Sequence, residues 1–396
     1  MIRTSPRRIA AALLLSIACL TSAVAVPGLA ADALPVVAPP DFYVLDPVPA
    51  GTSGQLLRSQ ELFAPEGMRL WAILYRSTGL AGEPIAVSGL VLSSADASAP
   101  DAAPRPILAI AHGTTGLADI CAPSRDPIKR LELIGAGFPA VADGWTVVAT
   151  DYAGLGTPGP HPYLDGPSEG RAVLHSILAA QQLPDAGAGT YAALQGISQG
   201  GHATLWAAQL AATEAPGVDI VGAVAAAPAG DLKAIADWAR SGGETPDSWG
   251  NTLTVAVAWS QAYGLPLDQL LNADGLAAAP RLETECRPDP AGQPLNLSEA
   301  IQPAWDAELA DNSPGAVAAP MPILYLQGTA DEQIPVVSAH ATRDRLCAVG
   351  DVVDYREIQG ASHAGSLYGD DRVTEARDWL DDRLTGIPAA DTCPAA

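Results

Sequence analysis

One short stretch near the middle of the chain constrains the fold more than any other. Residues 191–202 read YAALQGISQGGH, so Ser198 has a glycine two positions before it and another two positions after it. An apolar run precedes the serine and an alanine-rich run follows it, which predicts a strand, a sharp turn and a helix. A turn this sharp strains the serine backbone, and its neighbours therefore need to be glycine. The pattern is typical of a nucleophile elbow, with the Ser198 hydroxyl at the start of a helix.

The N-terminus has the pattern of a secretory signal. Three arginines precede apolar residues 9–20, and small residues follow through Ala25. This predicts a signal peptide over residues 1–31, with cleavage near Ala25 or Ala31. The apolar run is too short for a stable membrane anchor. We therefore expect a secreted, extracellular protein.

Short apolar runs alternate with helical patterns along much of the mature chain. The strand-like runs are residues 107–111, 145–150, 191–195, 220–225 and 323–326, preceded by an antiparallel pair at 70–75 and 85–92. Helical patterns at 169–183 and 201–212 lie between them. Alternation of this kind predicts an α/β protein with a mostly parallel, doubly wound sheet.

The alternation stops between Pro228 and Pro320. Residues 231–240, 255–271 and 298–309 look helical, with glycine and proline between them. Structureless loops of such length are uncommon, so the interval predicts a helical cap over residues 228–318. The core would then comprise residues 32–227 and 319–396.

Four cysteines remain after the predicted signal peptide: Cys121, Cys286, Cys347 and Cys393. An even number in an exported chain indicates two disulfides, for which three pairings are possible. We favour Cys121 with Cys286 and Cys347 with Cys393, because the second pair would tether the C-terminal tail. No CxxC or CxxH spacing occurs, so we expect no metal site.

The formal charge of −23 excludes two classes of partner. A chain this acidic is repelled by nucleic acid and by anionic membrane surfaces. The charge says nothing about the reaction. We expect a monomer.

A serine nucleophile needs a base, which on a fold of this kind follows an acid along the chain. Three histidines follow Ser198. His202 lies one turn into the predicted helix and would support the elbow, whereas His340 falls within another helical pattern. His363 follows a strand-like run and lies in the small-residue loop GASHAG. His363 is therefore the candidate base.

The candidate acid is Asp331. It lies in a turn that follows the strand-like run 323–326 and precedes a helical pattern. An aspartate there could merely cap the helix. Its neighbour Glu332 is the alternative acid. We prefer Asp331 because this glycine-led turn would deliver its carboxylate to the sheet edge that carries Ser198.

Attack on a carbonyl also needs N–H groups that stabilise the oxyanion. One donor should be the N–H of Gln199, directly after the nucleophile. The other should come from the loop after an earlier strand, where AHGTTG spans residues 111–116. We select Thr114 there, with Gly113 and Thr115 as alternatives.

Taken together, these motifs resemble the secretory lipase family of α/β-hydrolases. The matching segments are residues 112–116, 121–124, 151–156, 196–206, 215–223 and 328–331, together with the His363 loop. The resemblance implies an α/β-hydrolase fold with a helical cap, and ester hydrolysis without a cofactor by Ser198, Asp331 and His363. It also supports the favoured cysteine pairing.

From the motifs and the resemblance together we expect a secreted serine ester hydrolase, either a lipase or an esterase. The substrate would be a small-molecule or lipid ester, met in solution or at a lipid–water interface. Two alternatives remain. The same residues could carry out acyl transfer, polyester cleavage or peptide cleavage, or the chain could be a catalytically inactive binding protein.

Overall fold

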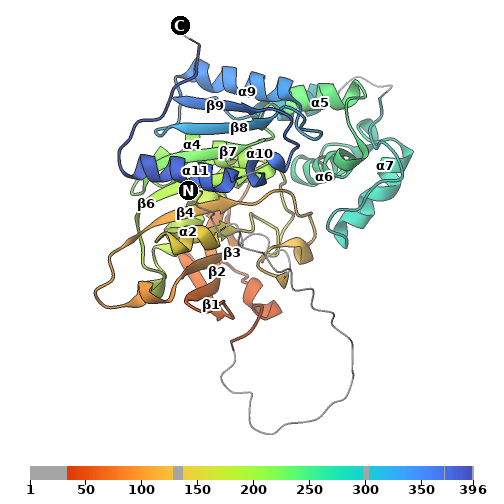
Figure 1. Ribbon diagram of the computed structural model, residues 1–396. Helices are drawn as coiled ribbons and strands as arrows, with labels where there is room; N and C mark the ends of the chain where they lie inside the picture. The colour runs from red at the N-terminus through yellow and green to blue at the C-terminus, as the bar shows by residue number, and fades with distance from the viewer. Residues whose placement is uncertain (1–33, 128–136, 298–302, 370, 395–396) are drawn as a thin grey trace, which may run out of the picture. The chain divides into compact units, whose positions relative to one another are not determined.

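The computed structural model describes residues 34–127, 137–297, 303–369 and 371–394. The predicted signal peptide, residues 1–31, lies outside this part of the chain. Within it, one sheet joins strands from both ends of the sequence (Figure 1). The strands are β1 (Leu56–Leu62), β2 (Met68–Thr78), β3 (Pro84–Ser94), β4 (Arg105–Ala111), β5 (Thr146–Thr150), β6 (Ala188–Ile197), β7 (Asp219–Ala226), β8 (Ile323–Gly328) and β9 (Val353–Ile358). Their order across the sheet is β1-β2-β3-β5-β4-β6-β7-β8-β9.

Strand direction decides where the loops meet. Across the sheet, the neighbouring strands β5, β4, β6, β7, β8 and β9 are all parallel. The strands β1, β2 and β3 pair antiparallel with one another, and β3 pairs antiparallel with β5. The carboxyl ends of parallel strands lie at one edge of a sheet. The loops after β4, β6, β8 and β9 therefore open at the same edge. This mostly parallel arrangement confirms the predicted α/β fold.

Helices cover both faces of the sheet. On one face lie α3 (Gly166–Ala180), α4 (Gln199–Glu214) and α9 (Val336–Val349). On the other lie α2 (Phe138–Ala142), α10 (Gly365–Tyr368) and α11 (Arg372–Leu384). The strands are apolar on both sides because each side packs against one of these layers. Short 3₁₀ turns are η1 (Pro40–Tyr43), η2 (Ala95–Ser98), η3 (Asp119–Cys121), η4 (Pro184–Ala186), η5 (Leu267–Gln269) and η6 (Ala279–Glu283).

The segment between β7 and β8 forms its own helical cluster. It contains α5 (Leu232–Arg240), α6 (Pro246–Tyr263), α7 (Ala273–Ala278) and α8 (Pro303–Asp311). In Figure 1, α5, α6 and α7 gather at the right of the sheet. Trp259 and Trp305 stack at its centre with 6.3 Å between ring centroids. Tyr163, from the loop before α3, joins the same apolar cluster and so connects it to the sheet.

One local prediction was wrong in its bounds, and one strand was missed. The helix predicted at 255–271 is α6, which begins at Pro246 and ends at Tyr263. Thr245 caps its start, and Gly264 ends it in a left-handed conformation with φ of 70°. Strand β1 was not predicted, because the polar residues between Arg58 and Glu61 hide it. It lies at the sheet edge, where such residues are tolerated.

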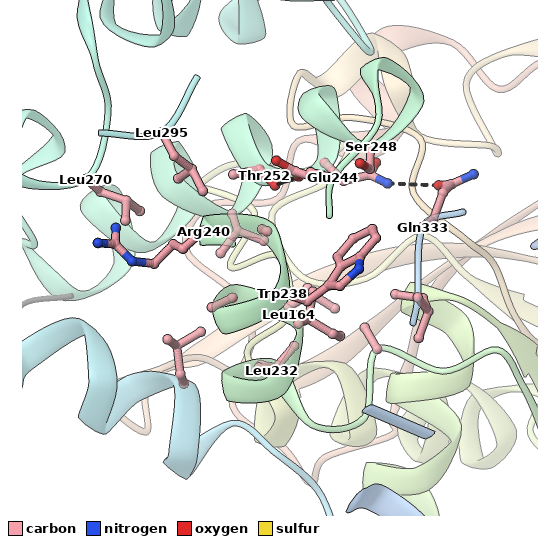
Figure 2. A pocket seen from close by; sticks show the side chains of 18 of the residues that line it. Leu164, Leu232, Trp238, Arg240, Glu244, Ser248, Thr252, Leu270, Leu295 and Gln333 are labelled. Carbon is pink, nitrogen blue, oxygen red and sulfur yellow. Dashed lines mark hydrogen bonds between the residues drawn. The ribbon is translucent and has the colours of Figure 1, made fainter. Parts of the chain in front are cut away.

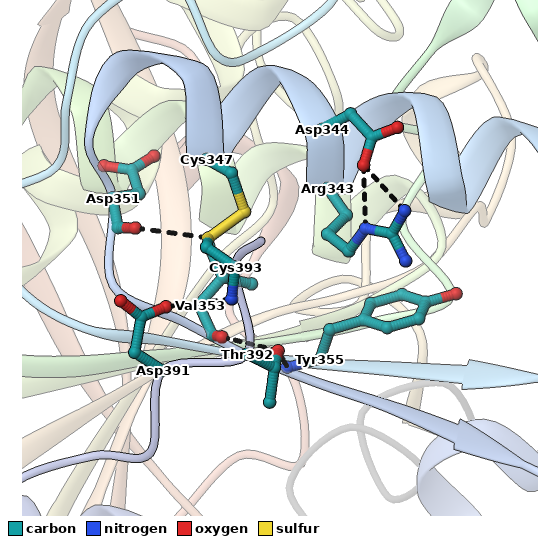
Figure 3. Close-up of a disulfide and its surroundings, with 9 residues drawn as sticks. All are labelled: Arg343, Asp344, Cys347, Asp351, Val353, Tyr355, Asp391, Thr392 and Cys393. Atoms are coloured by element: carbon teal, nitrogen blue, oxygen red, sulfur yellow. Dashed lines mark hydrogen bonds and ion pairs between the residues drawn. A yellow bond between two sulfur atoms is a disulfide. The ribbon is translucent and has the colours of Figure 1, made fainter. Parts of the chain in front are cut away.

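Both disulfides have the favoured pairing. Cys121–Cys286 joins the loop after β4 to the inserted segment across a separation of 165 residues. Cys347–Cys393 ties the C-terminal tail to α9 (Figure 3). Beside it the main-chain N–H of Thr392 donates to Val353 O at 2.8 Å, so the tail covers part of the last strand. On the chain-entropy account each bond stabilises the fold by several kcal/mol.

None of the helices in the described ranges combines the length and the apolar character that crossing a membrane requires.

Candidate active site

The turn at Ser198 has the strained geometry that the sequence predicts. Ser198 adopts φ of 60° and ψ of −122° between β6 and α4. Its N–H donates to Ala226 O at 3.0 Å, which fixes the turn to the neighbouring strand β7. A Cβ on Gly196 would overlap the carbonyl of Gly200, and a Cβ on Gly200 would overlap the carbonyl of Ala111. Both glycines are therefore required by close backbone contacts.

His363 and Asp331 meet at the same edge of the sheet. His363 Nδ1 lies 2.9 Å from Asp331 Oδ2 and 3.1 Å from Oδ1. The residues come from different loops, since His363 follows β9 and Asp331 follows β8. The imidazole is buried, with 7% of His363 exposed. Asp331 thus holds the ring through Nδ1, and Nε2 has no hydrogen-bond partner within the described part of the chain.

Two further contacts fix the carboxylate of Asp331. Oδ1 accepts from the main-chain N–H groups of Gln333 at 2.9 Å and Ile334 at 2.8 Å. The amide of Gln327 donates to Oδ2 at 3.2 Å. Glu332, the alternative acid, instead accepts from the main-chain N–H of His363 at 3.2 Å. Asp331 therefore orients the ring, while Glu332 contacts only the backbone.

Ser198 opens into an apolar pocket (Figure 2). Most of the lining comes from the inserted helices, and Figure 2 shows Trp238 near the middle of the view close to Leu164, with Leu270 and Leu295 on its left side near Arg240. Gln333 and Ile334, which hold Asp331, also line the pocket. In the described residues the hydroxyl of Ser198 makes no hydrogen bond, to His363 or to any other group. Such contacts are often loose without a substrate.

The two predicted oxyanion residues lie on either side of the elbow. Gln199 begins α4, where a first-turn N–H has no helical acceptor. Thr114 lies in the loop after β4, and a Cβ on Gly113 would sit 3.8 Å from that of Ser198. Among the described residues neither the Thr114 N–H nor the Gln199 N–H has a hydrogen-bond acceptor. The Thr114 hydroxyl is 2.6 Å from Tyr163 OH, which fixes this loop.

His112, directly after β4, is buried beside this loop. Its Nδ1 contacts Gly113 O at 2.7 Å, and Nε2 has no partner among the described groups. The ring packs on Tyr152 with 4.5 Å between centroids. Burial lowers the pKa of His112 from 6.5 to about 4. His112 is therefore neutral at neutral pH and is a part of the loop's packing.

The lowered pKa of His112 predicts a loss of stability in acid. Between about pH 6.5 and 4 the unfolded chain binds a proton here that the folded chain does not, so the free energy of unfolding falls as the pH falls through this interval. The full effect is about 3 kcal/mol. We expect the His112→Phe variant to lack this effect. The difference in the free energy of unfolding between the two proteins, measured with denaturant, should therefore change between pH 7 and pH 4. A difference that stays constant with pH would contradict the burial of a neutral imidazole.

The other two histidines after the elbow lie away from the reacting groups. His202 is fully buried on α4, and its Nδ1 lies 2.7 Å from Glu169 Oε2, so it supports the elbow as predicted. His340 lies on α9, where its Nε2 is 2.6 Å from Glu357 on β9 at the surface. Only His363, of these three, contacts Asp331.

Sequence reasoning missed the buried polar groups behind the elbow. Glu169 on α3 is 1% exposed, and its Oε1 accepts from the side chain of Gln199 at 2.8 Å. Asn312, after α8, accepts from His202 Nε2 at 2.8 Å through its carbonyl. Nothing local in the sequence marks these residues, because they come from separate elements. In the described ranges, no group of three or more histidine, cysteine or acidic side chains is arranged to hold a metal ion.

The chain is similar in sequence to one protein family and to a curated relative. The model of the family described as secretory lipase matches residues 134–242. A curated relative in Mycobacterium tuberculosis, named a probable inactive lipase, is 27% identical over 376 residues, which is 85% of this chain and 80% of the relative. The resemblance to secretory lipases drawn from the motifs is therefore confirmed.

Solved structures share the fold. Lipase A of Candida antarctica in its closed state is 20% identical with a TM-score of 0.68, covering 86% of this chain and 84% of that chain. The rice cell wall degrading esterase LipA of Xanthomonas oryzae is 20% identical with a TM-score of 0.66, and the match covers 84% of this chain and 100% of that chain. At this identity the likeness shows an α/β-hydrolase fold and nothing of the substrate.

Proposed function

We propose that this chain, which resembles the secretory lipases, is a secreted serine hydrolase of carboxylic esters. The observation that carries the proposal is the meeting of three loops at one sheet edge. These loops bring a strained serine, an apolar pocket, and a buried imidazole that is held by a carboxylate. No cofactor takes part in the proposed reaction.

In the proposed mechanism Ser198 Oγ attacks the carbonyl carbon of the ester as His363 Nε2 removes its proton. Asp331 keeps the proton on Nδ1 and stabilises the imidazolium that forms. The N–H groups of Gln199 and Thr114 bind the oxyanion. The imidazolium then protonates the leaving alcohol, and an acyl group remains on Ser198. Water activated by His363 releases the acid and restores the serine.

The pocket beside Ser198 favours an ester with an apolar acyl group. We propose that residues 228–318 form a cap over a core of residues 32–227 and 319–396, and that the acyl chain lies under α5 and α6. The substrate would be a triacylglycerol or a shorter-chain ester. Aliphatic and aromatic side chains dominate the lining, with Glu244 and Arg240 among its few charged groups.

Hydrolysis of p-nitrophenyl esters of increasing acyl length tests this proposal. Each methylene that the pocket buries should raise kcat/KM by up to about fourfold, until the pocket is filled. The Ser198→Ala protein provides the matched blank. Repeating the series above the solubility limit of each ester distinguishes a lipase from an esterase, since a jump in rate above that limit indicates a lipase. Absence of hydrolysis for every ester would contradict it.

The relative that is named inactive makes a non-catalytic binding protein the second candidate. That protein is similar over most of its length to this chain. The two candidates differ in one chemical property, because only an active serine hydrolase forms a covalent bond with a phosphonate through its serine. Acyl transfer or polyester cleavage on the same residues would keep that bond. Adding an alcohol acceptor, or supplying a polyester film, distinguishes them from simple hydrolysis.

We propose that the protein acts outside the cytoplasm as a monomer. The predicted signal over residues 1–31 and the two disulfides, which persist in oxidising compartments, support the location. Mass spectrometry of the protein from culture medium would test the location, through a mature mass that starts after Ala25 or Ala31 and lacks four cysteine hydrogens. Its molar mass by light scattering would test the monomer.

A further inference from the structure

A buried histidine and glutamate face each other directly behind the nucleophile turn. His202, in the first turn of α4, has no exposed surface, and Glu169 on α3 is 1% exposed. His202 Nδ1 lies 2.7 Å from Glu169 Oε2, and His202 Nε2 lies 2.8 Å from the carbonyl oxygen of Asn312. Both ring nitrogens therefore face oxygen atoms.

The number of protons in this pair follows from its partners. The Asn312 carbonyl can only accept, so His202 Nε2 must carry a hydrogen. The 2.7 Å contact between Nδ1 and Glu169 Oε2 needs a second hydrogen, on one atom or the other. Glu169 Oε1 already accepts from Leu164 N at 2.9 Å and Gln199 Nε2 at 2.8 Å, so that hydrogen does not lie on Oε1. The two hydrogen bonds of the ring thus need one hydrogen on Nε2 and one between Nδ1 and Oε2.

This pair also determines the position of Gln199. The Gln199 side-chain amide donates to Glu169 Oε1 and, at 3.3 Å, to His161 Nε2. His161 Nδ1 lies 2.9 Å from the Ala153 carbonyl, which leaves Nε2 free to accept. Both hydrogens of the amide are therefore used. The residue so held is the one whose main-chain N–H is to bind the oxyanion.

We propose that His202 and Glu169 are positioning residues for the Gln199 N–H. The inference rests on the proposed ester hydrolysis. Glu169 holds the Gln199 side chain through Oε1 and is itself held by His202 through Oε2. Loss of these contacts would displace an N–H group that has to point at the oxyanion.

The chain contains a matched control on the same two helices. His175 on α3 is fully buried, and its Nε2 lies 3.3 Å from Glu214 Oε2 on α4. Its Nδ1 lies 2.8 Å from the hydroxyl of Ser77, which can donate as well as accept. Within the described residues, no hydrogen bond joins this pair to Gln199. The pair also lies at the opposite end of α4 from Ser198.

The decisive variants are Glu169→Ala and Glu169→Gln. A glutamine can accept from Gln199 and Leu164 through its oxygen and donate to His202 Nδ1 through its nitrogen, so these hydrogen bonds remain. Glu169→Ala should lower kcat about 10²-fold with little change in KM, since a small displacement of a catalytic group has that effect. Glu169→Gln should restore kcat to within a few-fold of the wild type, and the control Glu214→Ala should keep the wild-type kcat and KM.

An NMR measurement on the intact mature protein adds a readout that does not depend on activity. In ¹H–¹⁵N spectra the side-chain amide signals of Gln199 should move in Glu169→Ala, stay close to their wild-type positions in Glu169→Gln, and not move in Glu214→Ala. Wild-type kcat in a folded Glu169→Ala protein, or equal losses of kcat in Glu169→Ala and Glu214→Ala, would overturn the inference. Ester hydrolysis by the wild type, and the phosphonate reaction of Ser198, would be unaffected by that result.

Discussion

Replacing Ser198 with alanine is expected to abolish ester hydrolysis, with kcat falling by about 10⁴-fold or more. The hydroxyl is the only group in the proposed mechanism that bonds to the acyl carbon, so no neighbour can take its place. The folded state should change little, since the Ser198 hydroxyl makes no hydrogen bond within the described residues. Initial rates with a p-nitrophenyl ester and a thermal unfolding curve measure both effects.

Ser362 provides the control for this substitution. It is an exposed serine in the loop that carries His363, one residue before the imidazole. Its hydroxyl has only a long contact with Gly365 N at 3.4 Å. Ser362→Ala should keep kcat within a few-fold of the wild type. If both alanine variants retain activity, the nucleophile is not Ser198.

Replacing Asp331 with asparagine is expected to lower kcat by about 10⁴-fold. The carboxylate only accepts, and it therefore keeps a hydrogen on His363 Nδ1 and leaves Nε2 able to take the serine proton. The main-chain N–H groups of Gln333 and Ile334 bind Oδ1, so an asparagine oxygen should remain there. Its NH₂ group would then face His363 Nδ1 and favour the tautomer that cannot act as a base.

Glu332→Gln is the matched control for the acid. Glu332 contacts the main-chain N–H of His363 at 3.2 Å, and glutamine retains an oxygen for this bond. We expect a loss of less than about tenfold, because the ring itself keeps its partner. The pair of kcat values thus decides between two adjacent carboxylates. A larger loss for Glu332→Gln than for Asp331→Asn would reverse the assignment.

The elbow was predictable because its signal is local. A serine between two close glycines, with an apolar run before it and a helical pattern after it, determines the turn without reference to the rest of the chain. The structure gives the reason, since Gly196 and Gly200 meet main-chain carbonyls where a Cβ cannot fit. The contact between Asp331 and His363 was also predictable from chain order, because both follow parallel strands that end at one edge.

The groups behind the elbow were not predictable. Glu169 and Asn312 are separated by more than a hundred residues, and each has an ordinary helical or turn context. Their burial depends on how α3, α4 and the inserted segment pack, which periodicity does not specify. For the same reason the predicted ends of α6 were wrong, since the leucines between 265 and 271 read as a continuation of the helix although Gly264 ends it.

The central claim, that Ser198 is an activated nucleophile, is tested most directly by covalent labelling. The protein is treated with a fluorophosphonate, digested, and sequenced by mass spectrometry. We predict one modified peptide, with the phosphonate on Ser198, and loss of labelling in the Asp331→Asn protein. An unmodified Ser198 in the folded wild-type protein, or a label on another residue alone, would contradict the claim.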